Sequence, residues 1–242
     1  MTIKHYFFNK NCVIDRGLSD HSGIELALAN EGVNFSHINF VNQIHSAEVL
    51  VIDDAKKIHG KQNLPKADAI VTNLPSLVIA IVTADCSPIL LYENNAKIIA
   101  AVHSGWRGAR SDIILNAIIA MEKLGADRSS IVANIGPMIH QKSYEVGQEF
   151  YDEFLAAEKS NAQFFQQTQA VEGLVRKYLF NLPSYVEQKL QQAGVKNIQN
   201  CNIDTYENHD YASYRRATHQ GNITQQGSMG PYGRNISAIV IN

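Results

Sequence analysis

Six short apolar runs between residues 38 and 103 constrain the fold of this 242-residue chain more than any other feature. Each run spans about four to eight residues, is rich in Ile and Val, and is bounded by Asn, Pro, Gly or Asp, which favours strands over helices. The segment ENNAK (93–97) separates the last two runs and predicts a hairpin turn. The runs are INFVNQ (38–43), EVLVID (48–53), ADAIVT (67–72), LVIAIVT (77–83), PILLY (88–92) and KIIAAVH (97–103).

After residue 107 the apolar residues recur at helical spacing instead. Residues 113–124 predict a helix that RSD (110–112) caps and Gly125 ends. We expect further helices around 147–159 and 183–193, the latter with Pro183 in its first turn, and strands at 130–136 and 235–242. Strands grouped early and helices interspersed later predict an α+β fold with mixed sheets. Because no repeat or Pro/Ser-rich linker interrupts the chain, we expect a single domain over residues 1–242.

Composition excludes several classes of function. A net charge of -2 and a pI near 6.5 give no electrostatic footprint for nucleic acid or an anionic membrane. No run of about 18 apolar residues predicts a membrane span, and the first residues lack the apolar stretch of a signal peptide, so we expect a cytoplasmic protein. Three widely spaced cysteines argue against a disulfide scaffold. We expect a small-molecule substrate as the partner, with no nucleic acid or membrane, and a monomer or small homo-oligomer.

Three metal-ligand residue types follow strand-like runs. His45 in NQIHSAEV, Cys86 in TADCSP and His103 in AAVHSGWRG each precede a Ser at points where a backbone leaves the sheet, and Pro88 is expected to end regular pairing. Two histidines and a cysteine make a zinc site with one position left open, as catalytic zinc sites have. The long spacings leave open that these are a buried cysteine and two hydrogen-bonded histidines.

The same residues allow a second interpretation. A cysteine beside a histidine can be a thiolate nucleophile whose base a third group orients. Asp85 precedes Cys86 in sequence, but neighbouring residues of a strand point to opposite faces, so Asp85 is instead expected to fix the turn.

The hexapeptide HSGWRG (103–108) predicts a tight strand-to-helix connection, because two glycines flank Trp106 and Arg107. Arg107 could bind an anion there as a bidentate donor, or bind nearby carbonyls while Trp106 packs in the core.

Two later segments carry further candidates for substrate binding. NIGPMIHQKSYEVG (134–147) brings Tyr144 and Glu145, and the end of the chain clusters Arg215, Arg216 and Arg234 in an otherwise neutral protein. The tyrosine and glutamate could lie at the rim of a site or in a structural loop. The arginines could bind an anionic small molecule or coat a solvated face.

Taken in order, these motifs resemble those of the YfiH/YlmD family, also called the laccase-domain or polyphenol oxidoreductase family. The resemblance covers roughly residues 38–242, through NQIHSAEV, ADAIVT, TADCSPILL, AAVHSGWRG, IGPMIHQKSYEVG, SYRR and a later GR. It implies a layered α/β/β/α fold similar to cysteine hydrolases and a zinc site made by His45, Cys86 and His103. It also implies phosphorolysis of adenosine, inosine and methylthioadenosine, with adenosine deamination. One branch of the family is instead described as removing a misincorporated serine from a peptidoglycan precursor.

The chain departs from the family pattern at both ends. In place of an aromatic-T-R-x-G-G-V-S stretch it has FFNKNCVIDRGLSD, in which Arg16, Gly17 and Ser19 match loosely, and the stretch between SYRR and GR is longer.

Among mechanisms, a multicopper oxidase is disfavoured, because no two of the nine histidines are spaced at i, i+2 and a multi-copper cluster needs many imidazoles. On the basis of the family resemblance, we expect Zn²⁺, with Cys86, His45, His103 and Arg107 as catalytic residues, in a purine nucleoside phosphorylase with adenosine deaminase side activity. Candidate proton carriers are Glu145 and Asp85. The alternatives are an amidase acting on a cell-wall precursor and a non-catalytic binding protein.

Overall fold

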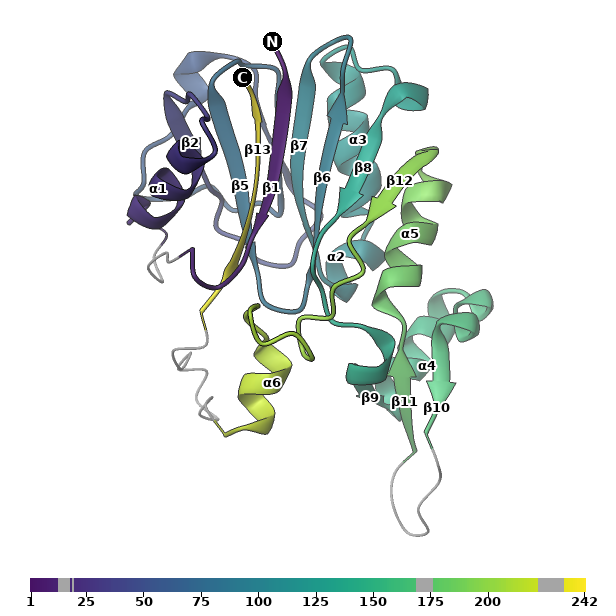
Figure 1. Ribbon diagram of the computed structural model, residues 1–242. Helices are drawn as coiled ribbons and strands as arrows, with labels where there is room; N and C mark the ends of the chain where they lie inside the picture. Colours follow the sequence, from purple (N-terminus) through teal and green to yellow (C-terminus); the bar gives the residue numbers. More distant parts are fainter. Residues whose placement is uncertain (13–17, 19, 169–175, 222–232) are drawn as a thin grey trace.

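The computed structural model describes residues 1–12, 18, 20–168, 176–221 and 233–242. Two sheets stack against each other, and helices cover their outer faces (Figure 1). A four-stranded sheet has the order β1-β13-β5-β2, a six-stranded sheet the order β12-β8-β6-β7-β4-β3, and a small third sheet the order β10-β11-β9. The two large sheets contain both parallel and antiparallel pairs, so the expected mixed sheets are confirmed.

The strands are β1 (Ile3–Phe8), β2 (His37–Asn39), β3 (Val49–Ile52), β4 (Ala69–Thr72), β5 (Leu77–Thr83), β6 (Ser87–Glu93), β7 (Ile98–Ser104), β8 (Val132–Ile135), β9 (Glu145–Gly147), β10 (Phe165–Gln167), β11 (Lys177–Phe180), β12 (Asn197–Asn200) and β13 (Asn235–Ile241). The helices are α1 (Ser22–Asn30), α2 (Trp106–Arg110), α3 (Ile113–Lys123), α4 (Gln148–Ala157), α5 (Leu182–Gln192) and α6 (Tyr214–His219). Short 3₁₀ turns span Ala55–Lys57, Arg128–Ser130, Gln141–Ser143 and Lys159–Phe164.

Alternation along the strands builds the layers. On β6, Ile89 and Leu91 face the helices, whereas Leu90 faces the other sheet. On β5, Ile79 and Ile81 likewise enter the space between the sheets. This period of two divides the apolar runs between two cores, as expected for strands buried on both faces.

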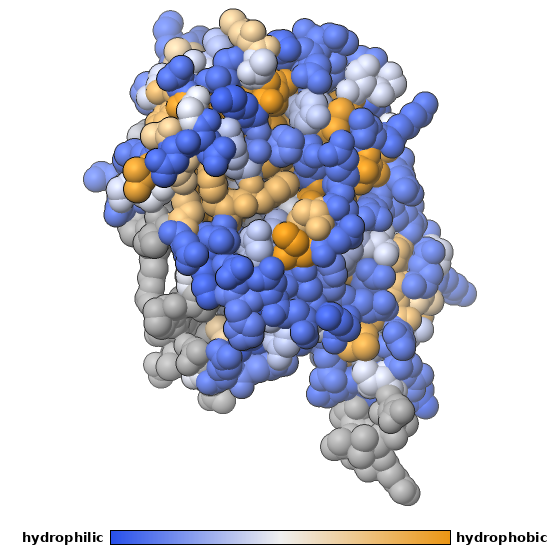
Figure 2. Space-filling model, in the orientation of Figure 1, coloured by the Kyte–Doolittle hydropathy of each residue, from blue (hydrophilic) through white to orange (hydrophobic). Residues whose placement is uncertain are grey.

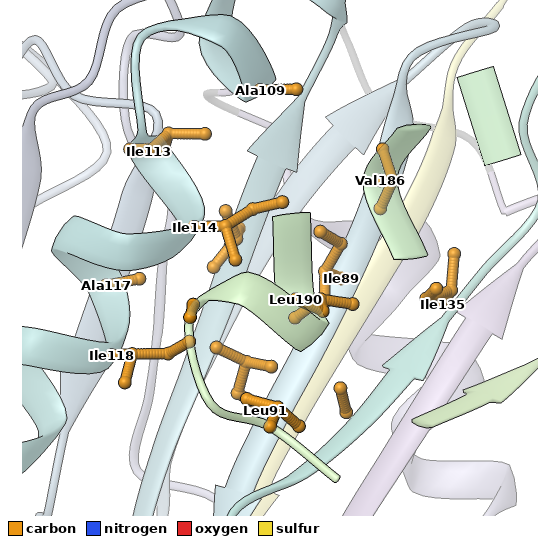
Figure 3. Close-up of a cluster of buried hydrophobic side chains, with 14 of the residues drawn as sticks. Ile89, Leu91, Ala109, Ile113, Ile114, Ala117, Ile118, Ile135, Val186 and Leu190 are labelled. Carbon is orange, nitrogen blue, oxygen red and sulfur yellow. The ribbon is translucent and has the colours of Figure 1, made fainter. Parts of the chain in front are cut away.

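The helices close the outer faces. Helix α1 places Ile24 and Leu28 on the four-stranded sheet. Figure 3 shows the opposite layer, where side chains of α2, α3 and α5 meet those of β6 and β8. The chain thus has the α/β/β/α layering that the resemblance implied; the cysteine-hydrolase similarity stays a prediction.

Two local expectations are wrong. The side chain of Asp112 does not cap α3; the residue adopts a left-handed conformation (φ 65°) and pairs with Lys189 at 2.6 Å. Pro88 does not end pairing, because it lies inside β6 opposite His103. Pro88 needs no N–H at this position, since the ladder between β6 and β8 begins only at Ile89.

The other signals at helix ends are confirmed. Pro183 lies in the first turn of α5, and Gly125 and Gly194 follow α3 and α5 with positive φ.

On the face that Figure 2 shows, hydrophilic residues cover most of the surface and apolar residues are exposed in smaller patches. Within the described ranges, no helix has the length and apolar character needed to cross a bilayer.

Candidate metal centre

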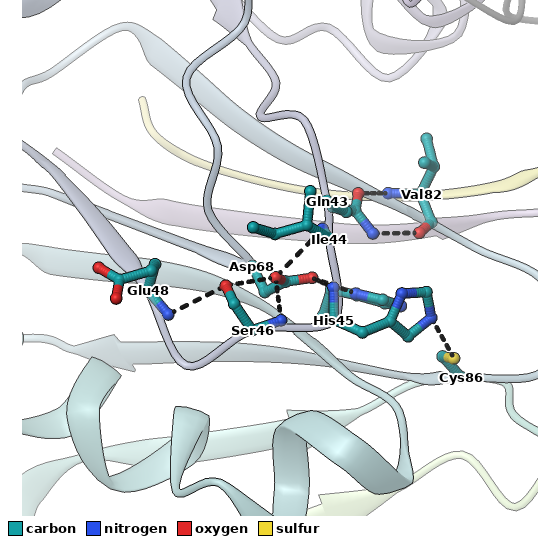
Figure 4. Close-up of polar contacts among 9 residues, drawn as sticks. Gln43, Ile44, His45, Ser46, Glu48, Asp68, Val82 and Cys86 are labelled. Carbon is teal, nitrogen blue, oxygen red and sulfur yellow. Dashed lines mark hydrogen bonds and ion pairs between the residues drawn. The ribbon is translucent and has the colours of Figure 1, made fainter.

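Three segments bring His45, Cys86 and His103 together. Cys86 lies in the turn between β5 and β6, His103 lies in β7 beside β6, and His45 lies in the loop between β2 and β3. One ligand atom from each residue lies within 4.8 Å of the others. The Cys86 Sγ is 3.8 Å from the His45 Nε2, and the two imidazole centroids are 4.8 Å apart (Figure 4). Among the described residues this is the group of three whose geometry suits a metal ion.

A buried carboxylate supports this trio, and we did not single it out from the sequence. The Asp68 Oδ1 accepts a hydrogen bond from the His103 Nδ1 at 2.8 Å, so Nε2 is the ring nitrogen left for a metal. Burial opposes the ionisation of Asp68, but hydrogen bonds from His103 and Ser46 outweigh it and lower its pKa to about 2. The sequence signal was an acid directly before AIVT, a wholly buried strand.

Gly105 leaves the space that the trio needs. A Cβ at this position would lie 2.8 Å from the Cys86 Sγ and 3.4 Å from the His45 Cδ2. Its φ of -72° is ordinary, so the glycine is required for room and not for backbone freedom. The expected tight connection in HSGWRG is confirmed, with α2 starting at Trp106.

Cys86 and His103 each favour the charged form of the other, as in a thiolate–imidazolium pair. Burial opposes ionisation of Cys86, but His103 and then His45 outweigh it and lower the pKa of the thiol to about 6. Burial also opposes protonation of His103, but Cys86 and Asp68 raise its pKa to about 9. A thiolate and an imidazole whose other nitrogen is anchored are the donor forms that bind a transition metal. The residues therefore fit a metal ion with two nitrogen donors and one sulfur donor.

Arg107 is exposed on α2. Its guanidinium lies 4.5 Å from the centroid of the Trp106 ring and has no hydrogen bond or ion pair with any described residue. Arg110 lies 5.6 Å from the same ring but is paired with Glu153 at 2.6 Å. Of the two readings of Arg107, the structure excludes binding to described carbonyls and leaves the guanidinium available to an anion.

Tyr144 and Arg215 lie together near the trio. The Arg215 guanidinium is 5.2 Å from the Tyr144 ring, and its NH1 donates to the carbonyl of Glu145 at 2.7 Å. Burial, with a smaller contribution from the charge of Cys86, raises the pKa of the Tyr144 phenol, although Arg215 opposes this. The Glu145 carboxylate points elsewhere and accepts a hydrogen bond from the Lys177 Nζ at 2.5 Å.

Two arginines expected to bind substrate, Arg216 and Arg234, make hydrogen bonds to backbone carbonyls. The guanidinium of Arg216 donates to backbone carbonyls of residues 205, 206, 208 and 211, so it organises that loop. Arg234 precedes β13, and its NH1 donates to the carbonyl of Gly233 at 2.9 Å.

Asp85 fixes the turn before Cys86, as its sequence position suggested. It has a positive φ of 85°, and its carboxylate accepts hydrogen bonds from the Thr205 Oγ1 and the Arg215 N–H, both at 2.6 Å. The expectations for Arg16, Gly17 and Ser19 fall outside the described residues.

Similarity to known proteins agrees with this arrangement. The sequence model of the family described as "Multi-copper polyphenol oxidoreductase laccase" matches residues 22–242. A purine nucleoside phosphorylase of Rickettsia conorii is 38% identical over 207 residues, covering 84% of this chain and 78% of the relative. A relative from Shigella flexneri named purine nucleoside phosphorylase YfiH is 34% identical over 181 residues, covering 73% of this chain and 68% of the relative.

Solved structures share the fold. YfiH of Bacillus licheniformis superposes with a TM-score of 0.80 at 21% identity, covering 99% of this chain and 93% of that one. A Neisseria meningitidis protein of the DUF152 family has a TM-score of 0.74 at 25% identity, covering 99% and 94%. The extent of the family match and the identity to its members show that the chain belongs to the YfiH/YlmD family of laccase-domain proteins.

Proposed function

We propose that this protein is a zinc-dependent purine nucleoside phosphorylase that acts on adenosine, inosine and methylthioadenosine, with adenosine deamination as a second activity. The names of its relatives and the trio of His45, Cys86 and His103 support an enzyme with a metal site. The observation that supports phosphorolysis is Arg107, an exposed guanidinium without an ionic partner among the described residues. It lies two residues from Gly105, where an added Cβ would meet Cys86 and His45.

The ligands of this chain favour a single zinc ion over the copper centres of a multicopper oxidase. A blue-copper site also has two histidine ligands and one cysteine ligand, but an oxidase needs a further cluster with many imidazoles. Within the described ranges, no second group of ligands has metal-binding geometry. When bound, zinc would supply Lewis-acid polarisation at its open position.

The residues of the chain would divide the remaining work of phosphorolysis. Arg107 would bind phosphate through its planar guanidinium, which matches two phosphate oxygens. An oxygen of hydrogen phosphate then attacks the ribose C1′, the bond from C1′ to the purine N9 breaks, and its electron pair leaves with the base. The proton that the phosphate loses ends on the purine, through solvent. Tyr144, whose pKa is raised, stays protonated and would donate a hydrogen bond from Oη to the leaving purine. In deamination, water adds to C6 of adenosine and ammonia leaves, without phosphate.

Incubation of the zinc-loaded protein with adenosine and phosphate tests this function. We expect adenine and ribose 1-phosphate, and inosine with ammonia when phosphate is omitted, all measured by chromatography. If neither pair of products forms with zinc bound at one ion per chain, the proposal fails.

Arg107 and Arg110 make a matched pair for the phosphate site, because both contact Trp106 but only Arg110 is paired, with Glu153. Arg107→Ala should raise the KM for phosphate by about tenfold or more, the loss of one charge-assisted contact of about 1.5–3 kcal/mol. Deamination should remain. Arg110→Ala should leave the KM for phosphate unchanged, and equal effects of both changes would contradict the role of Arg107.

The pairing of Cys86 with His103 favours one second candidate, an amidase acting on a serine-bearing cell-wall precursor. A thiol whose pKa is lowered to about 6 is the nucleophile that such an enzyme needs. A sulfur bound to zinc is a poor nucleophile, so this activity would belong to the metal-free protein. Release of serine by the metal-free protein, abolished by zinc, would support the amidase over the phosphorylase.

A further inference from the structure

We propose that Asp68 is a positioning residue that holds both histidines of the trio in their binding geometry before any metal arrives. The two histidines lie in segments 58 residues apart, and this one carboxylate contacts both. The inference concerns metal binding alone, so it stands or falls independently of the reaction proposed above.

Asp68 fixes His103 through two hydrogen bonds. The Asp68 Oδ1 accepts from the ring Nδ1 at 2.8 Å, and the Asp68 carbonyl accepts from the His103 backbone N–H at 2.8 Å. The ring and the backbone of His103 are thus both fixed to one residue, which directly precedes the neighbouring strand β4. The carboxylate also fixes which ring nitrogen keeps its proton, because Nδ1 donates to it and Nε2 is then the nitrogen that can release a proton and bind a metal.

The Asp68 carboxylate also fixes the loop that carries His45. Three consecutive N–H groups, those of Ile44, His45 and Ser46, donate to the Asp68 carboxylate at 3.2, 3.0 and 2.6 Å, and the Ser46 Oγ donates at 2.7 Å (Figure 4). Successive N–H groups that converge on one anion form a nest. His45 has a φ of 59°, a left-handed conformation that a residue with a side chain adopts only when its surroundings hold it.

These contacts make Asp68 a common support for two ligands. It is fully buried and accepts five hydrogen bonds from side chains and backbone of the two histidine-bearing segments. Exposed His45 has no such support from its own side chain, so its position depends on the loop backbone. Loss of the carboxylate would therefore release the tautomer of His103 and the loop of His45 together, and would leave Cys86 as the one ligand still in place.

Measuring the zinc affinity of Asp68→Asn tests whether Asp68 positions the ligands. The matched control is Ser46→Ala, which removes one of the five hydrogen bonds and keeps the charge of Asp68. Competition with a chromophoric chelator should show a zinc affinity lower by about 10–100-fold for Asp68→Asn and within about threefold of wild type for Ser46→Ala. The absorption of the cobalt(II) form should change in Asp68→Asn. Wild-type affinity and an unchanged cobalt spectrum in folded Asp68→Asn would overturn the proposal.

A measurement on the unaltered chain covers the case in which Asp68→Asn does not fold. In metal-free wild-type protein, ¹⁵N shifts of His103 should show a proton on Nδ1, and the amides of residues 44–46 should exchange slowly with solvent. If Nδ1 is unprotonated, or if these amides become protected only after zinc is added, Asp68 does not position the ligands in advance. Neither readout involves a substrate, so a failed phosphorolysis assay would leave them unaffected.

Discussion

The space around the Cys86 sulfur is set by single atoms. Gly105 contributes no side chain where a methyl group would lie 2.8 Å from that sulfur, and the glycine itself is buried. The geometry of the site therefore depends on the absence of a side chain at Gly105 as well as on the three ligands.

Gly105→Ala should therefore weaken zinc binding without unfolding the chain. The added methyl group must displace Cys86 or His45, and overpacking of about 1–3 kcal/mol corresponds to a loss of affinity of about 5–150-fold. Chelator competition measures it. Gly60→Ala is the control, because a Cβ there meets nothing within 4 Å. Equal affinities for the two variants would show that the trio does not need this space.

The three cysteines should differ in reactivity in metal-free protein. The pKa of Cys86 is lowered to about 6, so its thiolate forms as pH rises through 6, whereas burial raises the pKa of Cys12 to about 11 and also raises that of Cys201. Iodoacetamide should alkylate Cys86 first, with a rate that reaches half its maximum near pH 6, and zinc should protect it. Mass spectrometry of tryptic peptides assigns the sites. A rate that rises only above pH 8 would contradict the thiolate–imidazolium pair.

At the scale of elements, helix α5 shows how an element is stabilised away from the site. Asn181 is its N-cap, with a side chain that accepts from the Ser184 N–H at 3.1 Å, and Pro183 occupies the first turn. Its buried residues Val186 and Leu190 pack on the six-stranded sheet (Figure 3).

Asn181→Ala should lower the free energy of unfolding by about 1 kcal/mol, the usual cost of losing an N-cap. Zinc affinity should not change, because α5 supplies no residue of the trio. Urea denaturation measures the loss, and Asn181→Ser, which can still cap, serves as the control. If both variants lose the same stability, the cap is not the cause.

For the whole molecule, the core between the two large sheets joins early and late parts of the chain. The last strand, β13, pairs with both β1 and β5, and Ile79 and Ile239 meet residues of the other sheet. We propose on this basis that the chain is a single domain.

Calorimetry should then show one cooperative unfolding transition. Ile79→Ala should lower the free energy of unfolding by about 2–5 kcal/mol and move the whole transition, because it opens a cavity between the sheets. Leu26→Ala, at a position 65% exposed on α1, should change it little. Two separate transitions in either protein would contradict a single domain.

The sequence by itself determined most strands of the two large sheets, helices α3, α4 and α5, and the identity of the three candidate ligands; it did not predict β1, β9 to β12, α1 or α6. Strand and helix periods are local properties, and His45, Cys86 and His103 were recognisable by residue type and by their places after apolar runs. The sequence motifs also identified the family. These features are readable because each depends on neighbouring residues or on a short pattern.

Only the tertiary structure decided what surrounds the ligands. Asp68 stands before a buried strand, and nothing in its neighbours reveals that it binds two distant segments. The roles of Arg216 as a loop organiser and of Arg107 as a cation without an ionic partner among the described residues likewise depend on which carbonyls and carboxylates the fold brings near each guanidinium. Hydrogen-bond partners and free space are set by residues far apart in the chain, and for that physical reason the sequence located the site while the fold determined its support.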